Sequence, residues 1–220
     1  MTDDLRDPEL PGRLLLTERD ALMPLLRGTP DDAFILRTAC PDWNARQVLA
    51  HCGAALIRIV EGRLERGVFS PESNAADVAE RDDWPLVRVL DELERGFTEA
   101  GPVIAARSDG LLDLVALGEW VHAGDVREAF GVPGAYAGES AEAALALLVI
   151  AGRRRRTPLL HAFLPGRSAP LAIGTAHDGR PAARLATDVP TLIRLFADRP
   201  LAGARYELTG AERTELHIFG

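Results

Sequence analysis

The strongest constraint on the fold is a series of apolar residues at helical spacing that runs through the first 155 residues. In the first segment, Leu14, Leu15, Leu22, Leu25 and Leu26 recur every three or four residues, and Gly28 ends the pattern. A short helix is expected after Thr29, and longer helices at about Asn44–Arg66, Trp84–Arg107, Leu111–Phe130 and Ser140–Arg155. Each apolar face must be buried against another helix, which predicts an antiparallel bundle of four or five helices.

The pattern changes near residue 156, after the run Arg153–Arg156. Short apolar segments between turn residues predict strands at 159–164, 171–173, 182–186, 205–208 and 216–219, with one helix at about 189–197. We therefore expect a helical bundle over residues 1–156 and a small α+β domain over residues 157–220. A domain of about 60 residues buries little core by itself, which favours its docking on the bundle.

Charge and composition exclude several classes of function. A net charge of -8 argues against general affinity for nucleic acid or membrane surfaces. No apolar run approaches the ~20 residues that span a bilayer, and no signal peptide is recognisable, so we expect a cytoplasmic protein, monomeric or homodimeric. The sequence contains no lysine, which excludes Schiff-base and phosphate-loop lysines, and it lacks GxSxG, GxGxxG and HExxH motifs.

The start of the second long helix carries the first candidate ligand. Asn44 can accept a hydrogen bond from the amide of Gln47, and the Gln47 side chain can reach back, which completes a capping box. His51 follows two turns later, among the apolar residues Val48, Cys52, Ala55 and Ile59. Since a single histidine on such a face is more often a core residue than a ligand, this segment alone favours a structural role.

A second segment places Glu119, His122 and Asp125 three residues apart, on one face of a helix. By itself, this spacing favours a surface glutamate and a half-buried histidine. Taken together, two helices of one bundle bring two histidines and a carboxylate onto apolar stripes. His51, Glu119 and His122 would supply three protein ligands and leave one position open, as in catalytic zinc sites. Asp125 could orient His122.

The same two segments, CPDWNARQVLAHCG and GEWVHAGDVREAFG, resemble the DinB-like proteins of actinobacterial type that are grouped with mycothiol-dependent maleylpyruvate isomerase. The C-terminal segments LIRLFADRP, ARYELTG and ELHIFG resemble the small C-terminal domain of these proteins. The resemblance implies a DinB-type antiparallel four-helix bundle, a small C-terminal α+β domain, a divalent metal and low-molecular-weight thiol chemistry. The metal is zinc in the isomerase, and nickel and iron are alternatives here.

The resemblance also assigns site residues. The two histidines and the glutamate that hold the metal in the family correspond to His51, His122 and an acidic residue before His122. The family glutamate stands four residues before the second histidine, where this chain has Gly118, and Glu119 follows one residue later. The third ligand can therefore be Glu119, Asp125 or water, or be absent. The catalytic arginine of the isomerase corresponds to Arg199, whose alternative interpretation is a surface residue at a helix end.

The implied mechanism begins with mycothiol, whose thiol would bind the metal and ionise near neutral pH. The thiolate would add to an unsaturated, carboxylate-bearing substrate held by Arg199. Elimination after rotation would give isomerisation, and retention of the adduct would give thiol transfer. We therefore expect a metal- and mycothiol-dependent isomerase or S-transferase, with the thiol and a small molecule as its only partners. The alternative is a non-catalytic metal-binding bundle that acts as a sensor, stress protein or interaction module.

Overall fold

Two compact units make up the protein, which a computed structural model describes at residues 6–41 and 43–219. The first unit spans Met1–Tyr136 and the second Ala137–Gly220. This division lies before helix α6 (Ala141–Arg155), whereas the sequence pattern placed the domain boundary after it, at residue 156. The difference arises because α6 packs against strand β2 (Leu171–Ile173) and helix α7 (Val189–Phe196) of the second unit. Helical periodicity does not reveal such a partner.

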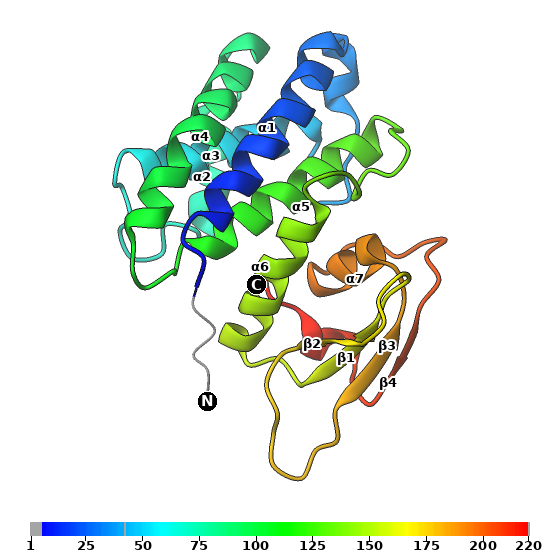
Figure 1. The fold of residues 1–220 in the computed structure, drawn as a ribbon. Coiled ribbons are helices and arrows are strands. Elements are labelled where there is room, and N and C mark those ends of the chain that lie inside the picture. Colours follow the sequence, from blue (N-terminus) through cyan, green and yellow to red (C-terminus); the bar gives the residue numbers. More distant parts are fainter. Residues whose placement is uncertain (1–5, 42, 220) are drawn as a thin grey trace. The chain divides into compact units, whose positions relative to one another are not determined.

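The first unit is built around four helices. They are α1 (Leu10–Gly28), α2 (Ala45–Val60), α4 (Leu86–Ala106) and α5 (Asp113–Ala129). Both α4 and α5 pack against α1 and α2, so the four helices enclose one core (Figure 1). Its fully buried side chains include Leu14, Leu22, Leu49, Leu56, Leu93, Phe97 and Trp120. The expected helical character of this part of the chain is confirmed.

Glycine contacts and one ion pair define the directions of the helices. A Cβ atom on Gly101 would lie 2.7 Å from the Cα atom of Gly12, so α1 and α4 touch through their backbones. At the other end of this pair, Arg27 of α1 binds Asp91 of α4 at 2.8 Å, which makes the two helices antiparallel. By contrast, Gly96 contacts Leu56, while Gly53 contacts Leu93. Helices α2 and α4 are therefore parallel, and the bundle is not antiparallel throughout.

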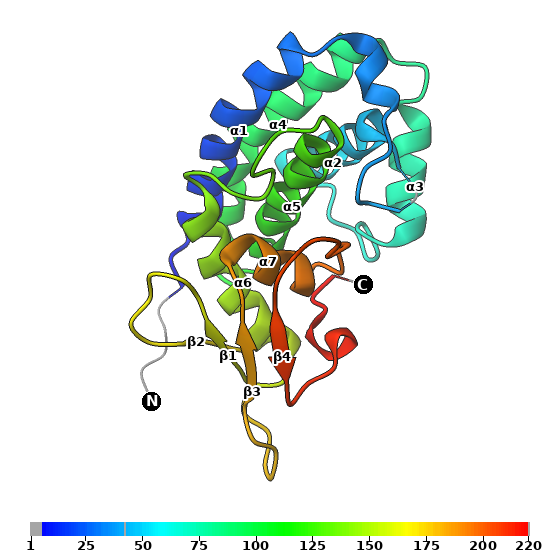
Figure 2. The ribbon, with the colours of Figure 1, turned by 90° about the vertical axis from the view of Figure 1, so that its right-hand side faces the viewer.

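The crossover between α2 and α4 contains helix α3 (Pro71–Glu80), which the sequence analysis did not predict. Ser70 caps this helix by accepting a hydrogen bond from the Ser73 amide at 3.3 Å. Helix α3 lies beside α2 (Figure 2), and buried charges attach it there, because Asp77 pairs with Arg58 of α2 at 2.6 Å. Little apolar surface of α3 is buried, so hydrophobic periodicity gave no signal.

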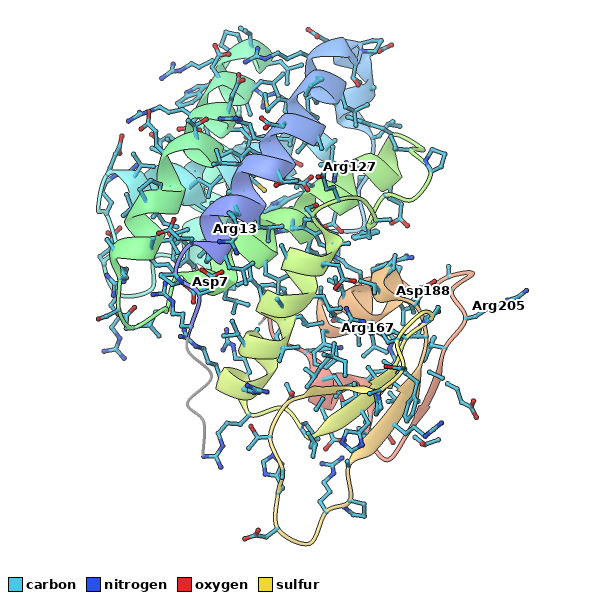
Figure 3. All side chains as sticks on the ribbon, viewed as in Figure 1. Asp7, Arg13, Arg127, Arg167, Asp188 and Arg205 are labelled. Atoms are coloured by element: carbon cyan, nitrogen blue, oxygen red, sulfur yellow. The ribbon has the colours of Figure 1, made fainter. Side chains whose placement is uncertain are left out.

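Ion pairs made by arginine also occur along the helices. Asp7 and Arg13 pair at 2.6 Å at the start of α1 (Figure 3). Inside the unit, Arg127 of α5 pairs with Glu18 of α1, and both side chains are buried. Within the described part of the chain, no helix is both long and apolar enough to cross a membrane.

The second unit contains a four-stranded sheet in the order β2-β1-β3-β4. Strands β1 (Leu160–Phe163), β3 (Ala183–Ala186) and β4 (Glu207–Thr209) join β2, with β1 and β3 parallel and the other pairs antiparallel. The face that carries Leu160, Ile173 and Leu185 is buried, and α6 lies against it because a Cβ on Gly152 would meet Ile173 at 2.7 Å. The expected small α+β part is confirmed.

The prediction of a strand at 216–219 is wrong. A 3-10 helix, η2 (Arg213–Leu216), occupies the start of this segment. The amide of Ile218 then donates to the carbonyl of Phe196 at the end of α7, at 3.0 Å. Leu216 and Ile218 are buried, so the alternating apolar residues reflect packing against a helix rather than pairing with a strand.

Candidate metal centre

The start of α2 fixes the position of His51. The Asn44 side chain accepts a hydrogen bond from the Gln47 amide at 2.9 Å, and the Gln47 side chain accepts one from the Asn44 amide at 3.1 Å. This confirms the predicted capping box. His51 lies on the buried side of α2 and is 9% exposed. The ring of Trp43, just before the helix, lies 4.8 Å from the His51 ring, measured between centroids.

Helix α5 brings His122 next to His51. The centroids of the two imidazole rings are 5.2 Å apart, and the ring planes stand at 83°. The two histidines therefore approach each other across two helices, as the sequence analysis predicted. Asp125 lies one turn further along α5, and its Oδ2 atom is 3.1 Å from Nδ1 of His122. Asp125 is fully buried, which makes it a fixed partner for the imidazole.

Burial controls the protonation of His51. Together with a smaller effect of the neighbouring His122, it lowers the pKa of His51 to about 3. His51 is therefore neutral at physiological pH and keeps a lone pair on one ring nitrogen. Its Nδ1 atom is buried and has no hydrogen-bond partner among the described residues. A buried imidazole nitrogen without a partner suits a ligand for a metal ion.

Glu119 lies on the same helix as His122 but beside Cys52 of α2. Burial raises the pKa of its carboxyl group to about 8, and a hydrogen bond with Cys52 opposes this rise. Burial likewise raises the pKa of the Cys52 thiol, in agreement with its expected packing as a small apolar residue. The Oε2 atom of Glu119 is buried without a hydrogen-bond partner in the described structure.

His51, His122 and Glu119 do not converge as three ligands. Within residues 6–41 and 43–219, no group of three or more His, Cys, Asp or Glu side chains is arranged to hold an ion. Helix geometry accounts for this. Positions three and four residues before His122 lie on opposite sides of it, because each residue turns the helix by about 100°. The acid at position 119, rather than 118, therefore lies beside Cys52.

Arg199 belongs to the second unit, just after α7. Its NH1 group donates a hydrogen bond to the carbonyl of Ala197 at 3.0 Å, and its amide donates to the carbonyl of Arg194 at 2.8 Å. The side chain is half-buried. The local contacts of Arg199 are thus those of a residue that terminates a helix, and its predicted role in binding a substrate stays a prediction.

Tyr136 contacts this group of residues and was not predicted from the sequence. Its hydroxyl group donates a hydrogen bond to Oδ1 of Asp125 at 2.6 Å, and its side chain is buried. The one signal in the sequence is Gly124, in the middle of α5, since an internal glycine weakens a helix unless another group needs the space. A Cβ atom at Gly124 would lie 2.3 Å from the ring of Tyr136.

No protein-family model matches the chain, and no curated protein is similar to it in sequence. A crystal structure of the mycothiol-dependent maleylpyruvate isomerase is similar in fold, with a TM-score of 0.60 and 14% identity over 94% of this chain and 95% of that one. A variant of that isomerase, with a histidine replaced by alanine, gives a TM-score of 0.58 at the same identity and coverage. The chain therefore has the fold of the mycothiol-dependent maleylpyruvate isomerase, as the resemblance of its sequence segments predicted.

Proposed function

We propose that this protein is a metal-dependent enzyme that uses a low-molecular-weight thiol, such as mycothiol, to isomerise a small electrophilic substrate or to transfer the thiol to it. The observation that carries the proposal is the pair His51 and His122, whose rings meet 5.2 Å apart between α2 and α5. The fold shared with mycothiol-dependent maleylpyruvate isomerase supports the thiol and the class of reaction. We assign the first unit to the DinB type of bundle, and the cytoplasmic location stays a prediction.

The donor set fits a divalent ion, with zinc as the first candidate and nickel or iron as alternatives. His51 is neutral and offers a buried nitrogen without a partner. His122 faces Asp125 through Nδ1, so a hydrogen on that nitrogen leaves the lone pair on Nε2. Glu119 is the proposed third ligand, and its unsatisfied Oε2 atom supports this role. To take it, the side chain turns away from Cys52.

The bound ion would supply one kind of chemistry, a lower pKa for a coordinated thiol. The protein's residues do the rest. Asp125 orients His122 and keeps its ring from rotating. The Trp43 ring lies next to the His51 ring at an angle of 39°, and the burial of His51 favours its neutral form. These side chains prepare a site in which the imidazole of His51 is neutral and that of His122 is held in one orientation.

We assign the anchoring of a carboxylate-bearing substrate to Arg199. In a chain without lysine, an anion must be bound by arginine, a backbone amide or a metal. A guanidinium group matches a carboxylate through two parallel N–H bonds. If Arg199 binds the substrate, Arg199→Ala should lower turnover or substrate affinity and leave the melting temperature nearly unchanged.

The test is an activity screen on metal-loaded protein. Zinc-, nickel- and iron-loaded samples are incubated with mycothiol and unsaturated acids, maleylpyruvate among them, with and without a chelator. We expect turnover that requires both thiol and metal, is lost in His51→Ala and His122→Ala, and survives in His177→Ala, whose side chain is exposed. Bound metal without any thiol-dependent turnover would contradict the proposal and would favour a non-catalytic metal-binding protein.

A further inference from the structure

A chain of two contacts links Tyr136 to His122. The Tyr136 hydroxyl donates to Oδ1 of Asp125 at 2.6 Å, and Oδ2 of the same carboxyl group lies 3.1 Å from Nδ1 of His122. Asp125 is fully buried, and Tyr136 is buried as well. A carboxyl group with one oxygen on a hydroxyl and the other on an imidazole has little freedom to rotate.

The local backbone is shaped to place Tyr136 there. After α5 ends, Gly131 and Gly134 adopt positive φ angles of 70° and 67°, which turn the chain back along the helix. The ring of Tyr136 then lies on Gly124, at a distance that leaves no room for a Cβ atom. The ring of Trp120 borders it, with centroids 6.5 Å apart. The ring is held by packing, so the hydroxyl is aimed at Asp125.

We propose that Tyr136 is a positioning residue that acts through Asp125 and holds His122 in the tautomer with hydrogen on Nδ1. In this tautomer the lone pair is on Nε2, the nitrogen away from Asp125. Without the hydroxyl, Oδ1 of Asp125 loses a hydrogen bond in a buried site, and the carboxyl group turns to recover one. The contact between Asp125 and Nδ1 of His122 then weakens. The consequence for metal binding rests on the proposed function, whereas the tautomer itself does not.

A purely structural role for Tyr136 gives a different expectation. If only the packing of the ring on Gly124 mattered, Tyr136→Phe would keep the ring and change nothing at His122. If the hydroxyl positions Asp125, the same variant keeps the fold, but His122 then populates both tautomers. Tyr206, the other tyrosine of the chain, is 37% exposed and provides the matched control Tyr206→Phe.

The experiment is NMR of metal-free protein with ¹⁵N-labelled histidine, at a pH where His122 carries a single ring hydrogen. Long-range ¹H–¹⁵N correlations report which ring nitrogen carries the hydrogen, and His122→Ala identifies the signals. We expect one Nδ1–H tautomer in the wild type and in Tyr206→Phe, and a mixture in Tyr136→Phe. An unchanged single tautomer in Tyr136→Phe would overturn the proposal.

A second variant keeps the test decisive if Tyr136→Phe does not fold. Asp125→Asn preserves the shape of the side chain but can present an N–H group to Nδ1, so it should move the hydrogen of His122 to Nε2. Retention of the Nδ1–H tautomer in this variant would also overturn the proposal.

Metal affinity separates this proposal from the proposed function. Calorimetric titration with zinc should give a Kd about 10–100-fold weaker for Tyr136→Phe than for wild type, and an unchanged Kd for Tyr206→Phe. If wild type binds no zinc but the tautomer changes in Tyr136→Phe, the positioning role stands and the metal function fails. If wild type binds zinc and Tyr136→Phe, like Tyr206→Phe, changes neither the tautomer nor the Kd, the positioning role of Tyr136 fails and the metal function stands.

Discussion

Replacing Glu119 by glutamine should stabilise the metal-free protein, and by more as the pH rises. Glu119 is 3% exposed, and burial raises the pKa of its carboxyl group from 4.5 to about 8. Between these two values the folded protein keeps the proton while the unfolded chain loses it. The folded state then binds more protons, so its stability falls as the pH rises. Glutamine has nearly the same shape and no proton to lose.

A window above pH 6.5 also keeps the stability of each protein free of a contribution from His51, the other buried group with a shifted pKa. Because the pKa of His51 falls from 6.5 to about 3 on folding, His51 lowers stability only when the pH drops below 6.5. Above that value Glu119 dominates the comparison, with a slope of about 1.36 kcal/mol per pH unit. Between pH 6.5 and 8, wild type should therefore lose roughly 2 kcal/mol relative to Glu119→Gln.

Urea denaturation of chelator-treated wild type and variant, at several pH values in this window, measures the difference. All other titrating groups are shared by the two proteins and cancel in the comparison. Glu139→Gln, at an exposed position, is the matched control and should show no such divergence. A stability difference between wild type and Glu119→Gln that does not change with pH would refute the argument that burial keeps this carboxyl group protonated.

Three further substitutions test the scaffold. Gly124→Ala places a Cβ 2.3 Å from the aromatic ring packed on it, so thermal unfolding should show a loss of about 1–3 kcal/mol; Gly28→Ala, with open space around it, is the control, and equal effects would contradict the packing. Asn44→Ala removes the capping box and should cost about 1 kcal/mol in urea denaturation, and no loss would show that the cap is dispensable. Asp77→Ala leaves Arg58 without its buried partner and should cost about 3 kcal/mol, whereas a cost typical of surface pairs, below about 1 kcal/mol, would contradict its role in holding α3.

Hydrophobic periodicity predicted those parts of the fold that are held by apolar faces. The helix that became α4 was expected within two residues of its ends, because its buried residues recur every three or four positions. The helix that became α5 was predicted equally closely, whereas α2 begins where expected but ends at Val60 instead of Arg66. Helix α3 escaped this reasoning because buried ion pairs attach it, notably Asp77 with Arg58. The boundary of the second unit was not predicted either, because the apolar pattern of α6 does not indicate which element the helix packs against.

The candidate site was also predicted only in part. The approach of His51 and His122 was predictable, because each histidine lies on the apolar stripe of a helix in one bundle. Glu119 lies beside Cys52 because each residue turns a helix by about 100°. A spacing of three or four residues places two side chains on one face, but it does not say on which side of the neighbouring residue each one lies. Tyr136 comes from a turn after α5, and only its contact with Asp125 reveals a role.

The measurement that tests the central claim most directly is the metal content of the protein and of its His51→Ala variant. Metal-free samples are titrated with zinc, nickel and iron(II), and the bound ion is quantified by mass spectrometry after removal of excess. We predict one ion per chain in the wild type and none in His51→Ala, with the same helical circular dichroism spectrum for both. A wild type that binds none of the three ions, or a His51→Ala variant that binds as much as wild type, would contradict the account.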